Sequence, residues 1–229
     1  MRGDMCSAYS AIVGRPSDQT AGTLRTSLVG GAGYDRSMDD PGSTEAGVYL
    51  RTPTETDREG FVALRRASAV SLAPWEPRAG DAEEQFGDQS FDRLLDRGES
   101  EADAPFLIHR TSDDEIVGYV GLGQIFRGPF RSCYIGYWIG DPYVGRGYGT
   151  SAARACLQTA FAPESEGGLG LHRVEAGIIP TNHASIALVR RVGMRKEGYS
   201  PRYLEINGEW QDHERWAITV EDWDAPPRR

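Results

Sequence analysis

One stretch, DPYVGRGYGT at residues 141–150, limits the possible folds of this chain more than any other. It joins a strand-like run, SCYIGYWIG, to a helix-like run, SAARACLQTAF. Glycines at 145, 147 and 149 lack the Cβ that would keep a ligand off the main chain, and the first N–H groups of the following helix have no acceptor within that helix. An anion at such a helix start gains about 0.3–1 kcal/mol when exposed. The stretch therefore predicts an α/β junction that holds a phosphate.

Three interpretations of this junction compete. A nucleotide P-loop requires a lysine and then Ser or Thr after its last glycine, but Thr150 follows Gly149 directly. A dinucleotide fingerprint has the spacing G-x-G-x-x-G at the first strand of a βαβ unit, whereas this chain has G-x-G-x-G in its second half. The third interpretation is an ordinary tight turn between a strand and a helix. The loop by itself leaves the ligand open.

Charge and cysteine content narrow the range of partners. With 25 Lys and Arg against 34 Asp and Glu, the net charge of −9 disfavours nucleic acid and anionic membranes and favours cationic partners. Cys6, Cys133 and Cys156 are an odd number without paired spacing, which supports neither a disulfide framework nor a metal site. We find no long apolar run and no secretion signal, so the expected location is the cytoplasm.

The chain divides by composition into three parts. Residues 1–46 are rich in Gly, Ser, Thr and Asp without a sustained period, and we expect this extension to be disordered. Periodic segments begin at residue 47, which gives a domain over 47–221 and a short tail over 222–229. A GGAG run at 30–33 precedes no helical pattern and is interpreted as part of a linker.

The domain is expected to have the order β α α β β β α β α β β. The first helix begins at a capping box of Thr54 and Asp57 and carries an apolar face of Phe61, Val62, Leu64, Ala67 and Val70. The second helix runs from Asp81 to Gly98, and Asn207-Gly208 is a hairpin turn. The other strands are expected at 47–53, 104–110, 115–126, 132–140 and 171–179, and the other helices at 147–161 and 183–192.

The junction also resembles a known site. The loop VGRGYGT, an Ala-rich helix, NHAS about thirty residues later and VGM at the end of the next helix resemble the acetyl-CoA site of the GNAT acetyltransferases. This resemblance spans most of residues 47–221. It implies an α/β (α+β) fold with a mixed, mostly antiparallel central sheet and helices on both faces. It also implies acetyl-CoA as co-substrate, without a metal.

The resemblance assigns the cofactor loop to Val144, Gly145, Arg146, Gly147, Tyr148 and Gly149. Val144 departs from the Gln or Arg of the family pattern, but the main-chain N–H groups from Gly145 to Thr150 would still form the phosphate cradle. Arg146 either adds charge beside the phosphates or is a solvated loop residue. Asn182 is an N-cap, a cofactor ligand or both, and Ile139 and Gly140 would pair their backbone with the pantetheine arm.

Direct transfer needs a neutral amine and a proton source for the CoA thiolate. An α-amine of pKa about 7.7–8.0 is roughly one-tenth neutral at pH 7, and a lysine far less so. Ser185, one helical turn after Asn182, resembles the general acid of RimL-like enzymes, although it could equally be an ordinary first-turn serine; the tyrosine that many relatives use is replaced by Val189. Glu175 shares a strand face with Arg173 and is either a base acting through water or the partner of that arginine.

The hairpin supplies candidate acceptor-binding residues. The two-residue turn predicts pairing of Glu205 with Trp210 and of Tyr203 with Asp212, which places these four side chains on one face. Such a face suits a cationic amine, or else holds a Tyr–Asp hydrogen bond that stabilises the sheet. His213 is expected on the opposite face, so a Ser185–His213–Asp212 triad is excluded.

The most specific resemblance is in RYLEINGEWQDHERWAITVEDW, LAPWEP and RSCYIGYWI, which together look like the RimJ branch, enzymes that acetylate the N-terminal residue of ribosomal proteins. It implies that Trp75 and Glu76 overhang the acceptor cleft. The expected activity is N-acetylation of a basic protein N-terminus, possibly ribosomal, in a ternary complex by a monomer or homodimer. Two alternatives are acetylation of a small cationic amine, such as a polyamine or aminoglycoside, and a non-catalytic acyl-CoA-binding module.

Overall fold

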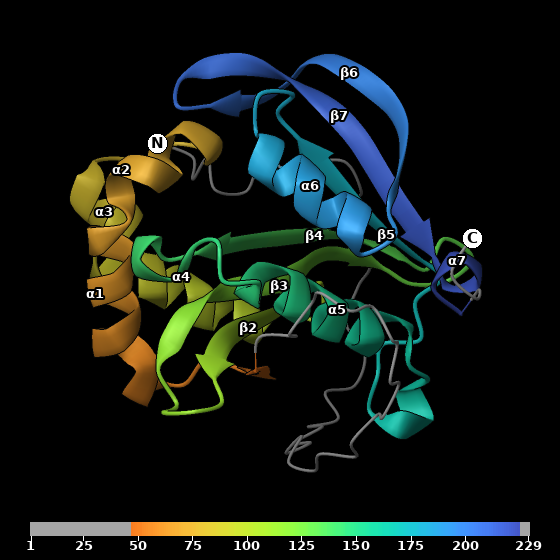
Figure 1. Cartoon of the computed structure of the whole chain (residues 1–229), viewed down its shortest axis with the longest axis horizontal. Coiled ribbons are helices and arrows are strands. Elements are labelled where there is room, and N and C mark those ends of the chain that lie inside the picture. Colours follow the sequence, from red (N-terminus) through yellow and green to blue (C-terminus); the bar gives the residue numbers. More distant parts are fainter. Residues whose placement is uncertain (1–46, 225–229) are drawn as a thin grey trace, which may run out of the picture. The chain divides into compact units, whose positions relative to one another are not determined.

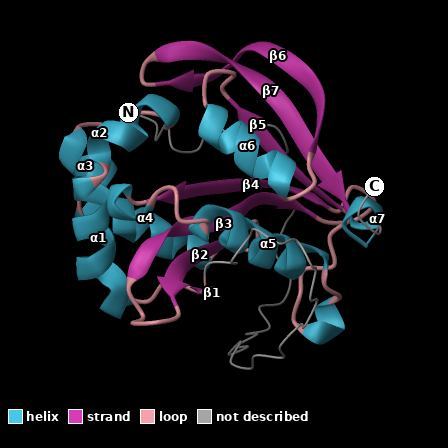
Figure 2. Ribbon diagram, in the orientation of Figure 1, coloured by secondary structure: helices cyan, strands magenta, loops and turns pink. Residues whose placement is uncertain are grey.

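The computed structural model describes residues 47–224. Their strands form one seven-stranded sheet with the order β1-β2-β3-β4-β5-β7-β6. The extension expected to be disordered, residues 1–46, and residues 225–229 lie outside the described residues. Figures 1 and 2 show helices on both faces of the sheet. The expected α/β class, with a mixed and mostly antiparallel sheet, is confirmed.

Strands β2, β3 and β4 form an antiparallel meander, as their short connections predict, and β1 pairs antiparallel with β2 at the edge of the sheet. The four strands are β1 (Val48–Arg51), β2 (Asp103–Arg110), β3 (Ile116–Phe126) and β4 (Ser132–Ile139). Their alternating side chains face two apolar layers. One layer packs under α5, and the other packs under α1 and α4.

Both helical segments between β1 and β2 are interrupted. The first comprises the 3₁₀ turn η2 (Glu55–Asp57), α1 (Arg58–Ala67), α2 (Ala69–Leu72) and the 3₁₀ turn η3 (Ala73–Trp75), with a break at Ser68. The second is broken at Gly87 into α3 (Ala82–Phe86) and α4 (Asp88–Gly98). Ala67, at the end of α1, is exposed, and Val70, beyond the break at Ser68, is 90% exposed, so the assignment of both residues to the apolar face was wrong.

The second half begins with the 3₁₀ turn η4 (Asp141–Tyr143) and α5 (Tyr148–Phe161), followed by η5 (Glu164–Glu166) and β5 (Arg173–Ile178). Next come α6 (His183–Arg191), β6 (Arg195–Ile206), β7 (Glu209–Thr219) and α7 (Val220–Asp224). Helix α7 crosses the domain boundary expected at 221, and its Trp223 packs on Phe161. Among residues 47–224, no helix combines the length and apolar character that crossing a membrane requires.

Strands β4 and β5 are parallel neighbours only at their N-terminal ends. Three residue pairs connect them, from Ser132–Arg173 to Tyr134–Glu175, and the strands then separate (Figure 1). Beyond Tyr134, the sheet therefore has two unpaired backbone edges in its interior.

The hairpin of β6 and β7 departs from the predicted register. Ile206–Glu209 and Glu205–Trp210 pair as expected, but Leu204 then pairs with Gln211 and Ser200 with His213. Residues 201–203 thus oppose the single residue Asp212, and Arg202 within this bulge has φ +46°. The predicted pairing of Tyr203 with Asp212 was wrong, because the bulge adds residues to one strand only.

Candidate active site

The separation of β4 and β5 opens a cleft of about 730 Å³. Its walls come from segments far apart in the sequence: η3 and the end of α2, the second half of β4, the loop before α5, the end of β5, α6 and one residue of β7. The cleft therefore lies at the carboxyl end of the parallel pair, where the backbone of both strands is open.

The glycine loop at the cleft has the geometry of an anion cradle. Gly145 and Gly147 have φ +76° and +84°, values that a side chain with Cβ adopts only under strain. Within the described chain, the N–H groups of residues 145–149 have no protein acceptor, and the first turn of α5 contains no acidic residue. Thr150 was expected to contribute its N–H as well, but this group donates to the Gly147 carbonyl oxygen at 3.0 Å. Five N–H groups remain for an anion.

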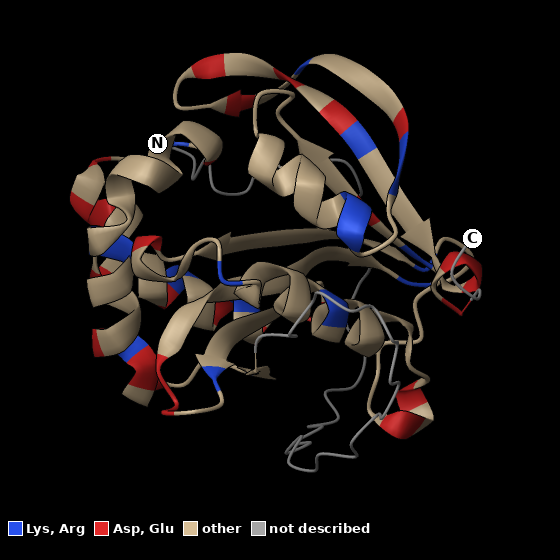
Figure 3. Ribbon diagram, viewed as in Figure 1, with Lys and Arg blue, Asp and Glu red and all other residues tan. Residues whose placement is uncertain are grey.

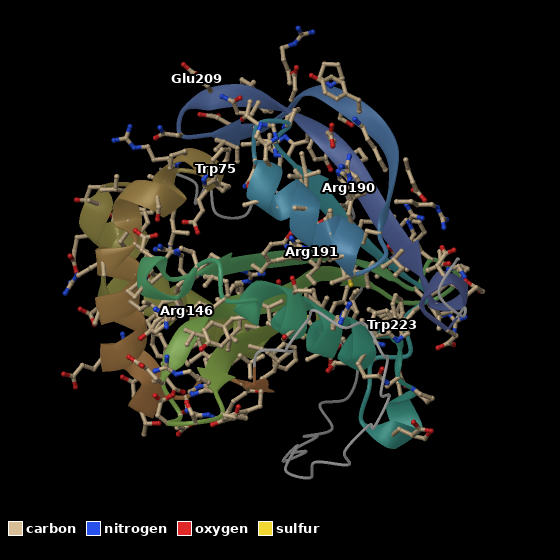
Figure 4. The ribbon with its side chains drawn as sticks, in the orientation of Figure 1. Trp75, Arg146, Arg190, Arg191, Glu209 and Trp223 are labelled. Atoms are coloured by element: carbon tan, nitrogen blue, oxygen red, sulfur yellow. The ribbon has the colours of Figure 1, made fainter. Side chains whose placement is uncertain are left out.

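Gly149 has a different role from the two earlier glycines. A Cβ on this residue would lie 2.9 Å from Leu188 Cδ1, so glycine permits the close approach of α5 to α6. The side chains of the loop contribute less than its backbone. Val144 lines the cleft and is 59% exposed, Tyr148 also lines it, and Arg146 is exposed outside the lining (Figure 4).

The open edge of β4 can pair with an extended ligand, but not at both predicted residues. Gly140 donates its N–H to the Val117 carbonyl and accepts from the Tyr143 N–H, so its backbone is already satisfied. Because Gly140 and Val117 form a hydrogen-bonded pair, the next pair, Ile139 with Gly118, directs its N–H and C=O groups away from the partner strand. Ile139 therefore offers its backbone to the cleft, and Gly140 does not.

Asn182, Ser185 and Tyr137 meet at the start of α6. The Asn182 side-chain oxygen accepts the Ser185 N–H at 3.1 Å, which is the predicted N-cap, and both residues line the cleft. The Ser185 hydroxyl lies 2.7 Å from the hydroxyl of Tyr137 on β4. Burial raises the pKa of Tyr137 to about 12, so it keeps its proton at neutral pH. When Tyr137 donates to Ser185, the hydrogen of the serine is left for a group in the cleft.

Tyr137 was not predicted as a site residue. Its strand was identified, but the strand pattern alone does not reveal that the side chain reaches α6. A tyrosine was sought instead within α6 at position 189, where Val189 is fully buried. In the structure, the tyrosine hydroxyl beside Ser185 comes from Tyr137 on β4.

Glu175 is held by two arginines rather than facing the cleft. Its carboxylate accepts from Arg215 at 3.1 Å and forms an ion pair with Arg173 at 3.3 Å. Arg215 also donates to the Tyr134 hydroxyl at 2.8 Å. Glu175 is absent from the cleft lining, and these contacts support its role as an internal ion-pair partner.

The segment around η3 forms the wall opposite α6. Trp75, labelled in Figure 4, lines the cleft and is 39% exposed. Glu76 also lines it, but both of its carboxylate oxygens accept from Arg65, at 2.8 and 2.9 Å. The Arg65 guanidinium in turn stacks on the rings of Phe86 and Trp138. Glu76 thus ties the η3 wall to α1.

The four hairpin residues do not form one face. Asp212 accepts from the Tyr199 hydroxyl and, at 2.7 Å, from the Arg202 N–H, while Tyr203 makes an edge contact with His213 on the other side of the hairpin. Glu205 and Trp210 are exposed near the hairpin turn. None of these four hairpin residues, which were predicted to bind the acceptor, lines the cleft.

The residue of β7 that does reach the cleft is His213, which the sequence pattern placed away from the acceptor-binding face. It is 3% exposed, and its Nδ1 lies 3.1 Å from the Gln211 carbonyl oxygen. Burial lowers its pKa below the usual 6.5, and the nearby Arg215 lowers it further. The ring is therefore neutral at pH 7.

Positive charge lies at the far end of α6. Figure 3 shows this helix without charged residues except at its C-terminal end, where Arg190 and Arg191 occur. Arg190 stacks on Trp216, and Arg191 lines the cleft. Together with the amide cradle, Arg191 makes this part of the cleft suitable for phosphate groups.

Comparisons with known proteins agree with this geometry. The family profile described as "Acetyltransferase (GNAT) domain" matches residues 48–195. "Probable N-acetyltransferase YjcK" of Bacillus subtilis is 37% identical over 76% of this chain and 95% of its own length. The "[Ribosomal protein uS5]-alanine N-acetyltransferase" of Escherichia coli is 31% identical over 66% of this chain and 77% of its own. A solved structure, "Mycobacterium smegmatis RimJ in complex with CoA-disulfide", has a TM-score of 0.72 and 34% identity, covering 79% of this chain and 86% of its own. This chain belongs to the GNAT family of N-acetyltransferases, which use acetyl-CoA.

Proposed function

We propose that this enzyme acetylates the N-terminal α-amine of a protein by direct transfer from acetyl-CoA. Two relatives support a protein acceptor, namely the uS5-alanine acetyltransferase and the RimJ structure. A ribosomal protein is the proposed acceptor class, because the enzyme's net charge of −9 favours basic partners.

The observation that carries this proposal is the scarcity of free carboxylates at the cleft. Among the cleft-lining residues, the acidic ones are Glu76 and Asp141. Glu76 is neutralised by Arg65 through both oxygens, and Asp141, which accepts from the neutral Ser71 hydroxyl, is the one acidic residue of the lining without a charged partner among the described residues. A polyamine carries several charges and would need free carboxylates along its length, whereas an α-amine carries a single charge that is lost before reaction. The cleft therefore suits a peptide end better than a polycation.

The binding and chemical roles follow from the two halves of the cleft. The amides of residues 145–149 would hold the CoA pyrophosphate, and Arg191, which lines the cleft, would add positive charge there. The backbone of Ile139 would pair with the pantetheine arm, and Asn182 would both cap α6 and contact the cofactor. The acceptor would enter beside Trp75 and attack the thioester carbonyl carbon, and Ser185 would protonate the departing thiolate.

The test compares acceptors of matched size. Purified full-length protein is given acetyl-CoA and peptides that begin with Ala or Ser, and thiol release is measured. The first control is the same set of peptides with a blocked N-terminus and one internal lysine. The second control is spermidine. We expect turnover only with the free α-amine, and mass spectrometry should place the acetyl group on the first residue. Turnover with spermidine and none with the peptides would refute the proposal.

A further inference from the structure

One histidine enters the cleft at the point where β5 leaves β4. All four histidines of the chain lie within residues 47–224, and His213 alone lines the cleft. It lies beside Gly177 of β5, where a Cβ would come within 3.5 Å of His213 Cδ2. Gly177 is also part of the lining, so the imidazole borders the open side of the separated strands.

The contacts of the ring determine which nitrogen carries the hydrogen. Nδ1 lies 3.1 Å from the Gln211 carbonyl oxygen, and a carbonyl oxygen only accepts hydrogen bonds. In the neutral ring, Nδ1 therefore holds the hydrogen and Nε2 holds a lone pair. Nε2 has no hydrogen-bond partner among the described residues, and the atom is not completely buried. It remains accessible from the cleft as an acceptor.

We propose that His213 is the catalytic base, with Nε2 taking the proton of the acceptor amine directly or through one water. The inference rests on the proposed function only for the choice of acceptor. The Nδ1–carbonyl contact orients the ring for this role, in the way that the partner of a base orients it in other acyl-transfer sites.

The step conserves protons. The neutral amine nitrogen forms a bond to the acetyl carbon as the carbon–sulfur bond breaks, and the surplus proton of the nitrogen passes to His213. The CoA sulfur receives a proton from Ser185. His213 then releases its proton to water, and Ser185 regains one from water, so that the products are the amide and the free thiol.

Burial, more than the surrounding charges, keeps the His213 ring in its neutral, basic form. On β7, Arg215 disfavours the charged imidazole and Asp212 favours it from the opposite face. On β6, Tyr203 contacts the ring through its edge, with 5.5 Å between centroids. Glu175 of β5 and Tyr134 of β4 are both bound to Arg215. Burial outweighs the favourable contacts and lowers the pKa of His213.

The test uses His213→Asn, because the Asn side-chain nitrogen can replace Nδ1–H in the contact with Gln211 while removing the base. His172→Asn, at an exposed histidine paired with Glu221, is the matched control. We expect kcat for His213→Asn at pH 7.5 to fall about 10²-fold or more, with the acetyl-CoA Kd unchanged. As the pH is lowered, log(kcat/KM) of the wild-type enzyme should fall with slope 1 below the pKa of the amine, because the amine becomes protonated. Below the pKa of His213 the slope should become 2, because the base is protonated as well. The Asn variant should keep slope 1 throughout.

A variant with wild-type rate and an unchanged second limb would overturn the assignment and leave the proposed acceptor intact. Turnover of spermidine in place of peptides would instead refute the acceptor, and the same pH profiles would then be measured with spermidine. A second readout needs no turnover. In ¹⁵N-histidine NMR of the full chain, His213 should carry its hydrogen on Nδ1 at pH 7.5 and titrate below 6.5. A proton found on Nε2 at that pH would exclude the base role.

Discussion

A valine at position 145 should separate cofactor binding from folding. Gly145 has φ +76°, and a Cβ there would meet nothing within 4 Å, so the cost of Gly145→Val is backbone strain rather than a clash. Gly128, in the turn between β3 and β4, offers a matched control with φ +66° and the same open surroundings. A β-branched residue in this conformation costs about 1–3 kcal/mol. Both variants should therefore fold, with a loss of stability no larger than this strain and smaller where the loop relaxes.

Only the variant at 145 should lose affinity for acetyl-CoA. The free loop can relax out of the strained conformation, and binding must then restore it to direct the N–H groups at the pyrophosphate. A cost of about 1–3 kcal/mol corresponds to a Kd roughly 5- to 150-fold higher. Isothermal titration with acetyl-CoA measures this, and urea unfolding measures stability. A Kd within twofold of wild type for Gly145→Val, or equal weakening by Gly128→Val, would refute the amide cradle.

Two further substitutions test the other residues of the cleft. Ser185→Ala should lower kcat by about 10²-fold or more and leave the acetyl-CoA Kd unchanged, and unchanged turnover would exclude Ser185 as the acid. Glu76→Gln should lower the free energy of unfolding by about 2–4 kcal/mol, because it leaves the buried Arg65 charge without its partner. The control Glu83→Gln breaks the exposed pair with Arg66 and should cost about 1 kcal/mol or less. Equal losses in urea unfolding would contradict the structural role of Glu76.

Local signals in the sequence predicted the helices, strands and turns well, whereas the arrangement of the sheet was expected from the GNAT resemblance. The capping box at Thr54, the glycine loop before α5, the Asn182 cap and the Asn207-Gly208 turn each specify the backbone through their own few residues. Such signals do not depend on distant contacts. The order of helices and strands along the chain and the backbone conformation of the glycine loop could therefore be predicted, the latter because it is set by the glycines themselves.

The acceptor side could not be predicted in the same way. The hairpin register was extrapolated from the turn, and a bulge of residues 201–203 moved Tyr203 to the face of His213 and left Asp212 with Tyr199. No residue pattern in the sequence predicted that bulge. The contact of Tyr137 with Ser185 joins residues 48 positions apart, so it depends on how β4 and α6 pack.

The interior edges of the sheet have a consequence for how this protein tolerates sequence change. After Tyr134, β4 presents N–H and C=O groups whose direction is set by pairing with β3 and not by any side chain. Substitutions along this strand can alter its packing while leaving those polar groups in place. A ligand with amide groups is therefore recognised by a feature that mutation rarely removes. In the proposed function, recognition of the acceptor would depend on individual side chains such as Trp75 and His213, and would therefore change by single substitutions while the cofactor stays the same.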